Sequence, residues 1–237
     1  IIYCLYNYNK TISSYELGRL MIDPLSTSRG NGTKLLFFLI EYAKNGALVT
    51  GVDLHEDQIN LTKLNFELRG LNYDEIKVAN AENLPFDDNQ FDFVMSFGVL
   101  HHTPDTQKSI DEVHRVLKED GTAIVMLYAR GWKHYIKRCF IQGILFAKYF
   151  RYGFSWQKVY NDASEVHGKS PKTGVYTKRQ IKRMFKEFKN IEISKKRLGE
   201  FFEYKPYNTY MFPKFVNNIF NLFNLVSLIG ENWLIRI

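Results

Sequence analysis

Residues 75–121 read EIKVANAENLPFDDNQFDFVMSFGVLHHTPDTQKSIDEVHRVLKEDG. The apolar runs at 75–78 and 91–97 are short and are bounded by turn residues, which predicts two buried strands. The segment 103–121 opens with Thr-Pro and closes with Gly, as helices commonly do. Its apolar positions fall on one helical face: Ile110, Val113 and Leu117. The stretch therefore predicts two strands followed by a helix.

The same alternation extends to both sides of this stretch. Residues 47–54 predict a buried strand that ends in an acid, residues 56–69 a helix, and residues 122–129 another strand. Strands and helices that alternate at this spacing indicate βαβ units and a parallel sheet. We therefore expect an α/β fold, a Rossmann-like three-layer sandwich, with its core in residues 1–130.

Residues 131–237 have a different character. An aromatic amphipathic helix is predicted at 132–150, a basic helix at 178–188 and strands at 190–198 and 232–237. Between them, residues 212–230 alternate apolar residues with asparagine, and this argues against a membrane span. We expect residues 131–237 to supply cap helices and to complete the same sheet, so that the chain is a single domain.

Composition limits the classes of protein that the chain can belong to. With 237 residues, 45% hydrophobic and 24% charged, the chain can bury one sizeable core. Cys4 and Cys139 are far apart and form no metal-ligand spacing, so no metal site is predicted. Sparse cysteine also fits a reducing compartment, and we predict a cytoplasmic protein.

Charge is unevenly divided along the chain. Residues 1–130 hold 12 Lys and Arg against 18 Asp and Glu (12 − 18 = −6), whereas residues 131–237 hold 20 against 7 (20 − 7 = +13). A basic half favours a nucleic-acid or an anionic membrane partner. The alternative explanation for the many lysines is the base composition of the genome, because the chain is rich throughout in residues with AT-rich codons. We therefore also expect the chain to make peripheral contact with a membrane.

Small and polar residues stand where predicted strands end. Gly30 and Gly32 allow a backbone to approach a ligand closely. Asp53 lies 21 residues beyond Gly32 (53 − 32 = 21), which suits an acid that accepts hydrogen bonds from a ribose; its alternative role is to cap the next helix. Asn80 ends the third strand, where an amide can meet the edge of an adenine ring. A nicotinamide dinucleotide site would need a glycine where the chain has Leu35.

These strings resemble the class I S-adenosylmethionine-dependent methyltransferases, in the branch that includes quinone-type and other small-molecule enzymes. The resemblance covers about residues 28–130, and AENLPF followed by FDFVMSFGVLHH carries most of it. It implies a mostly parallel seven-stranded sheet whose last strand, NWLIRI, inserts antiparallel next to NIEISKK. It also implies S-adenosyl-L-methionine as the cofactor.

The family pattern implies a role for each matching position. Its glycine loop falls on Gly30 and Gly32, and its ribose-binding acid on Asp53. Further positions would hold the adenine and the methionine part of the cofactor: Leu54 beside the adenine, Asn80 and Ala81 at its edge, and Phe97 and Gly98 at the methionine. Asn80 stands where the family usually has Asp, and an amide can both accept and donate there.

The segment around the glycine loop departs from the family pattern of an apolar strand, an acid and Gly-Cys-Gly-x-Gly. Counting back from Gly32 puts Ser28 at the first glycine and Pro24 inside the strand, where proline is rare. A gap would instead make residues 20–23 the strand and the acid. We therefore expect either true divergence or a compensated reading-frame slip over residues 24–40.

Other residues are candidates for the acceptor side. His101 and His102 follow the fourth strand, where a neutral imidazole can take a proton from the methyl acceptor; the alternative is that they only pack. His167 and Tyr176 are candidate substrate residues, with an ordinary surface loop as the alternative. The aromatic helices at 132–150 and 215–229 would form core, a cap over an apolar acceptor or a membrane contact.

We therefore predict transfer of a methyl group from S-adenosylmethionine to a small, apolar acceptor. The main alternative is a catalytically inactive binding protein of the same fold with a degenerate cofactor loop. A nucleic-acid methyltransferase is disfavoured. Residues 96–102 read SFGVLHH, without the Pro-Pro-aromatic string of base methylation, and neither Cys4 nor Cys139 is placed as a nucleophile.

Overall fold

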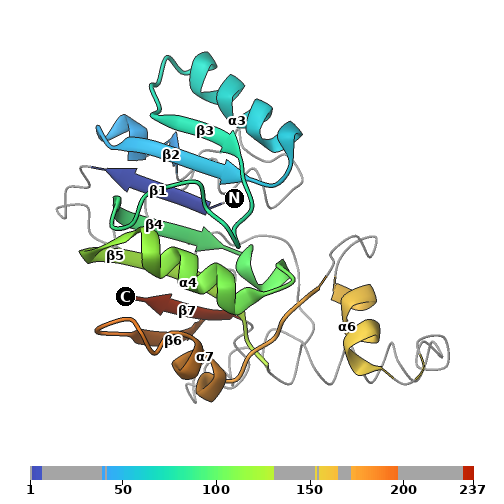
Figure 1. The fold of residues 1–237 in the computed structure, drawn as a ribbon. Helices are drawn as coiled ribbons and strands as arrows, with labels where there is room; N and C mark the ends of the chain where they lie inside the picture. The colour runs from blue at the N-terminus through green and yellow to red at the C-terminus, as the bar shows by residue number, and fades with distance from the viewer. Residues whose placement is uncertain are drawn as a thin grey trace, which may run out of the picture.

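The computed structural model describes residues 2–6, 39–40, 42–130, 153, 155–164, 172–196 and 232–237. Within them, seven strands form one sheet in the order β3-β2-β1-β4-β5-β7-β6 (Figure 1). The strands are β1 (Ile2–Tyr6), β2 (Leu48–Asp53), β3 (Glu75–Val78), β4 (Phe91–Phe97), β5 (Leu117–Tyr128), β6 (Glu192–Lys196) and β7 (Asn232–Arg236). The helices are α3 (Glu56–Leu68), the 3-10 helix η2 (Leu100–His102), α4 (Thr106–Val116), α6 (Trp156–Ser164) and α7 (Lys178–Met184).

The α/β, Rossmann-like prediction is confirmed. β2 pairs with β3, and β4 with β5, in parallel. The closing strand β7 lies between β5 and β6 and is antiparallel to both, which is the place that the resemblance implied. The carboxyl ends of β2, β3, β4 and β5 therefore lie along one edge of the sheet, which we call the carboxyl edge.

The centre of the sheet differs from the expectation, in which only the last strand was antiparallel. β1 lies between β2 and β4 and is antiparallel to both, with Ile2 opposite Val52 and Ser96 (Figure 1). β1 therefore starts at the carboxyl edge and leaves the sheet at the opposite edge. Its sequence, IYCLY, is rich in residues that favour strands buried on both faces. The strand expected at 20–23 lies outside the described residues.

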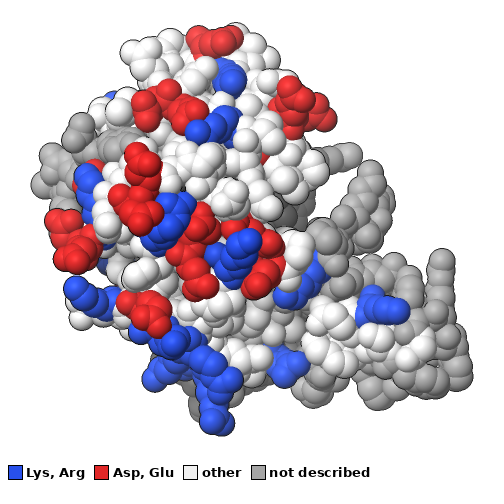
Figure 2. All heavy atoms as spheres, viewed as in Figure 1, with Lys and Arg blue, Asp and Glu red and all other residues white. Residues whose placement is uncertain are grey.

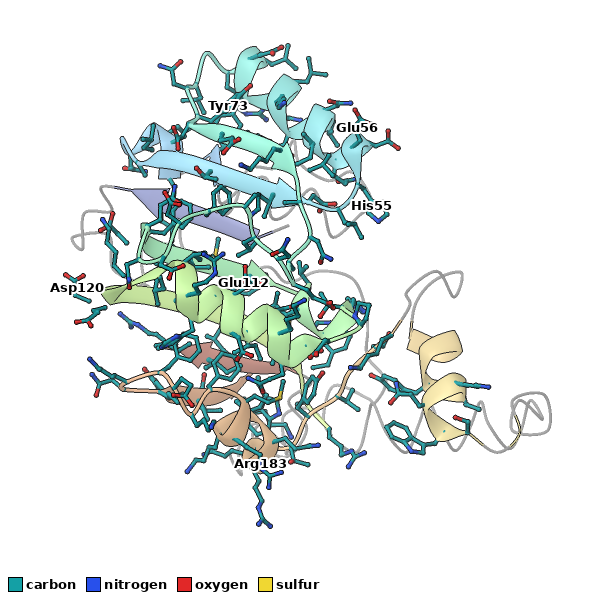
Figure 3. The ribbon with its side chains drawn as sticks, in the orientation of Figure 1. His55, Glu56, Tyr73, Glu112, Asp120 and Arg183 are labelled. Carbon is teal, nitrogen blue, oxygen red and sulfur yellow. The ribbon has the colours of Figure 1, made fainter. Side chains whose placement is uncertain are left out.

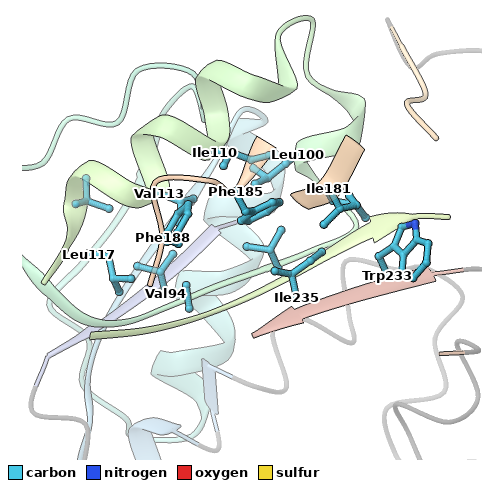
Figure 4. Close-up of a cluster of buried hydrophobic side chains, with 14 of the residues drawn as sticks. Val94, Leu100, Ile110, Val113, Leu117, Ile181, Phe185, Phe188, Trp233 and Ile235 are labelled. Carbon is cyan, nitrogen blue, oxygen red and sulfur yellow. The ribbon is translucent and has the colours of Figure 1, made fainter. Parts of the chain in front are cut away.

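Helices cover both faces of the sheet. α4 and α7 pack on one face, where Val94, Ile110, Phe185 and Ile235 belong to one buried cluster (Figure 4). α3 packs on the other face, where Ile59 and Phe66 belong to one buried cluster with alternate residues of β4, Phe93 and Met95. Successive side chains of a strand point to opposite faces, so β4 serves both clusters.

The helix ends follow their local sequence. Asp105 caps α4 by accepting from the N–H of Lys108 at 3.1 Å, and Thr177 and Gln180 form a capping box on α7. Gly70, with φ of 62°, turns the chain after α3 in a conformation that favours glycine. Most elements predicted from the sequence are present, whereas β1 and α6 were not predicted.

The predicted helices at 132–150 and 215–229 lie outside the described residues. In the part of the chain that the structure does describe, no helix is both long enough and apolar enough to cross a membrane.

Candidate functional site

Asp53 ends β2 at the carboxyl edge. One of its carboxylate oxygens accepts from the backbone N–H of His55 at 2.8 Å, within the turn that leads into α3. Its backbone carbonyl accepts from Ala79 at 2.9 Å, so β2 and β3 stay paired up to this edge. The next residue, Leu54, is 66% exposed, although leucine is normally buried. A carboxylate and an uncovered apolar side chain therefore lie together.

Asn80 holds the corresponding position after β3. Its side-chain oxygen accepts from the N–H of Glu82 at 3.0 Å, and its backbone carbonyl accepts from Asn83 at 3.0 Å. These bonds close a tight turn over residues 80–83, with Ala81 half-buried in it. The structure thus brings Asp53, Leu54, Asn80 and Ala81 to one end of two neighbouring strands. We call these four residues the adenosine end, after the role that the resemblance implies.

The loop after this turn is held by two charged residues of α4. Arg115 donates to the carbonyls of Leu84 and Phe86 at 2.9 and 2.7 Å, and Glu112 accepts from the N–H of Leu84 at 2.6 Å (Figure 3). Arg115 also contacts both Glu112 and Asp88 at 2.8 Å. One ion pair therefore satisfies three backbone groups of a loop that has no secondary structure of its own.

The electrostatics of this pair favour the charged forms. The hydrogen bond from Arg115 lowers the pKa of Glu112, although burial opposes the shift. In turn, Glu112 and then Asp88 raise the pKa of Arg115 above its usual value. Both groups are therefore ionised at neutral pH, as the contacts require.

A further carboxylate, that of Glu82, accepts from the backbone N–H of Asp105 at 2.7 Å and links the turn over residues 80–83 to the start of α4.

Phe97 and Gly98 end β4 at the same edge. Phe97 is half-buried and packs against the cluster under α3. Gly98 has φ of 74°, and a Cβ added there would lie 3.5 Å from the side chain of Met126. The left-handed conformation, rather than lack of space, makes glycine the suitable residue.

His101 and His102 form most of η2, and they differ in burial and in contacts. His101 is fully buried, its ring lies 3.9 Å from that of Tyr128, and its carbonyl accepts from Gly174 at 2.7 Å. His102 is half-buried, and its Nδ1 lies 3.1 Å from the carbonyl oxygen of Lys172. Because a carbonyl only accepts, this contact assigns the proton of a neutral His102 to Nδ1.

Tyr176 also lies at this edge, where it bridges to Ala129 after β5. Its hydroxyl donates to Thr106 at 2.8 Å, and its backbone carbonyl accepts from Trp233 at 2.6 Å. Burial raises the pKa of its phenol. The structure therefore gives the hydroxyl of Tyr176 a partner within the protein. We call His101, His102, Tyr128 and Tyr176 the histidine end.

Three predicted site residues, Gly30, Gly32 and His167, lie outside the described residues. Three residues that the structure brings to the site were missed: Glu112, Arg115 and Tyr128. Glu112 and Arg115 are three apart and share one side of α4, and a charged pair beside the apolar face of a helix was the available signal. Nothing in the local sequence marks the contact of Tyr128 with His101, because it joins the end of β5 to η2, which are separate elements of the chain.

The chain is similar to methyltransferases of known sequence. Residues 29–125 match the family described as methyltransferase domain, and this span holds every predicted cofactor residue. The phthiotriol/phenolphthiotriol dimycocerosates methyltransferase of Mycobacterium tuberculosis is 33% identical over 114 residues, which are 48% of this chain and 40% of that protein. The ubiquinone biosynthesis O-methyltransferase of Coxiella burnetii is 33% identical over 94 residues, 40% of each chain. This chain thus spans about two fifths of the relatives' length.

A crystal structure of an S-adenosylmethionine-dependent methyltransferase from Methanosarcina mazei has a TM-score of 0.51 and 20% identity, and covers 83% of this chain and 84% of that chain. At this identity the likeness shows the fold alone. Family, relatives and fold agree with one another. Residues 29–125 thus match a methyltransferase domain, and the chain is similar in sequence to methyltransferases and in fold to an S-adenosylmethionine-dependent methyltransferase.

Proposed function

We propose that the chain transfers a methyl group from S-adenosylmethionine to a small, apolar acceptor. The observation that carries the proposal is the adenosine end, where Asp53, Leu54 and Asn80 come from two neighbouring strands to one edge. Ligands of open α/β sheets bind at this edge. The relatives are named for dimycocerosates and for ubiquinone biosynthesis, which favours an apolar acceptor for this chain too.

The residues present suit the adenosine part of the cofactor. The carboxylate of Asp53 would accept from the ribose hydroxyls, and the amide of Asn80 would meet the adenine edge beside Ala81. Leu54 and Val78 are 66% and 48% exposed at the ends of β2 and β3, and an adenine ring would cover such apolar surface. Phe97 and Gly98 would adjoin the methionine part. When bound, S-adenosylmethionine supplies an electrophilic methyl group on its sulfonium.

The acceptor would lie toward the histidine end. We propose His102 as the group that takes a proton from the acceptor, since it is half-buried while His101 is sealed in the protein. The contact with Lys172 would orient the imidazole for that task. His101 would position η2 through its ring contact with Tyr128. Tyr176 and His167 remain proposed substrate residues, and the hydroxyl of Tyr176 would have to leave Thr106 to reach the acceptor.

A second candidate function is supported by the direction of β1. In a Rossmann-like unit the first strand ends at the carboxyl edge and delivers the glycine loop there. Here β1 begins at that edge and is antiparallel to its neighbours. A chain of this kind fits a binding protein of the methyltransferase fold with a degenerate cofactor loop, and such a protein would lack affinity for the cofactor.

Isothermal titration of the purified chain with S-adenosylmethionine and with S-adenosylhomocysteine decides between the two functions. We expect micromolar binding of both, and a loss of about 2–4 kcal/mol in Asp53→Ala, which removes a charged acceptor of two hydrogen bonds. Glu56→Ala is the matched control, because Glu56 is an exposed acid three residues further on. Absence of binding by a folded wild-type chain would reject the enzyme and leave the binding protein.

A further inference from the structure

α7 and the turn after it concentrate positive charge. Residues 177–190 hold six Lys and Arg and one acid, Glu187 (6 − 1 = +5). Lys178, Arg179, Lys182 and Arg183 are exposed and lie at i and i+4 spacing, while Ile181 and Phe185 point into the core. We call these four cations the α7 basic face. Figure 2 shows Lys and Arg gathered over α7, and Figure 3 shows Arg183 at the periphery of the molecule.

Three cations elsewhere in the described part of the chain form ion pairs. Lys77 contacts Glu75, Arg115 contacts Asp88 and Glu112, and Lys118 contacts Asp92. By contrast, no ion pair joins the α7 basic face to a carboxylate of the described residues. Unpaired charges of one sign on one helix keep a strong local potential, which attracts an anionic partner.

Helix stability does not account for the α7 basic face. Lys178 and Arg179 occupy the first turn of α7, where the helix dipole favours acids and disfavours cations. The capping box of Thr177 and Gln180 already satisfies that end of the helix. The cations therefore require an explanation outside the folding of α7.

We propose that the α7 basic face rests on an anionic membrane surface. A lipid surface is favoured over a single-stranded nucleic acid because such strands are bound by cations interleaved with exposed aromatic rings. The aromatic residues here, Phe185 and Phe188, are buried at 0% and 8% exposure. A convex helix that presents only cations suits a plane of phosphate headgroups, which attracts each basic residue by charge alone. The chain would thus take up an apolar acceptor at the surface of the membrane that holds it.

Sedimentation with vesicles tests this proposal without any cofactor, so its outcome is independent of the proposed function. Vesicles of phosphatidylcholine with about one third phosphatidylglycerol should bind the chain, and pure phosphatidylcholine should not. Lys178→Gln with Arg179→Gln should weaken binding about fivefold for each charge, or about 25-fold. The matched control is Lys44→Gln with Lys108→Gln, which removes two exposed cations outside α7. Lys108 also lies in the first turn of a helix.

Three results would overturn the proposal. Equal binding to both vesicles would remove the role of anionic lipid, and equal losses in the two double variants would assign the effect to net charge. Binding to single-stranded RNA that depends on the α7 basic face, without binding to either vesicle, would assign the surface to nucleic acid. Circular dichroism and thermal unfolding of each variant check that the chain still folds, as expected because all four substituted cations are exposed.

Discussion

The two ends of the carboxyl edge differ in the burial and in the hydrogen-bond partners of their side chains. At the adenosine end, Leu54 and Asn80 are exposed and Asp53 is half-buried, and the side chains of Asp53 and Asn80 each accept a hydrogen bond from the backbone two residues further on. At the histidine end, His101 is fully buried, and Tyr176 bonds to a residue 70 positions away. The first end is built from local turns, and the second from long-range packing.

This difference separates binding from stability. A side chain that is exposed in the free protein contributes little to folding, and a ligand can cover it. A side chain already packed and bonded by the protein contributes to folding, and a ligand must displace it. The adenosine end should therefore respond to substitution in cofactor affinity, and the histidine end in the free energy of unfolding.

The largest effect is expected where the adenosine end depends on α4. Arg115→Ala should lower the free energy of unfolding by about 3 kcal/mol, because it leaves two loop carbonyls and a buried part of Glu112 without their charged donor. Lys118→Ala is the control: the Lys118–Asp92 pair is more exposed, at 38% and 31% of the side chains, and its loss should cost less than about 1 kcal/mol. Urea unfolding at pH 7 measures both.

The same pair gives this prediction a pH signature. The folded-state pKa of Glu112 is lowered from 4.5, so its contribution to stability is complete above that pH and is lost as the pH falls through the folded pKa. The difference between wild type and Arg115→Ala should therefore shrink in acid. A difference that is constant from pH 7 down to about pH 3 would mean that Arg115 acts by packing alone.

The sequence predicted the histidine pair but not the unequal roles of its members. Their position after β4 follows from the local pattern, whereas burial of His101 depends on Tyr128 and Gly174, which arrive from other parts of the chain. The fold shows the same division between local and long-range determinants.

The periodicity of the sequence predicts β2 to β5, α3 and α4, because each of these elements is determined by its own residues. The place and direction of β1 depend on pairing with β2 and β4, which no local pattern encodes.

A smaller effect should separate the two histidines. His101→Ala should cost about 2 kcal/mol of unfolding free energy, since it empties a buried site that packs against an aromatic ring. His102→Ala should cost less than about 1 kcal/mol, because a half-buried ring loses one hydrogen bond to a carbonyl. Thermal or urea unfolding of both variants gives the comparison. Equal losses would show that burial does not distinguish the members of the pair.

The smallest effect, and the sharpest test of the comparison, is at Leu54. Leu54→Ala should leave the free energy of unfolding within about 0.5 kcal/mol of wild type, because the side chain is already exposed. It should weaken binding of S-adenosylmethionine about five- to tenfold, since an adenine ring loses part of the apolar surface that it covers. Calorimetric titration measures the affinity, and urea unfolding the stability.

Leu61→Ala is the matched control for this variant. Leu61 is the same residue type, is 46% exposed and lies in the second turn of the adjoining helix α3. Its substitution should change neither stability nor affinity. Equal losses of affinity in the two variants would mean that Leu54 is ordinary exposed surface. A loss of stability confined to Leu54→Ala would mean that the adenosine end, like the histidine end, is held by the fold, and the separation of binding from stability would fail.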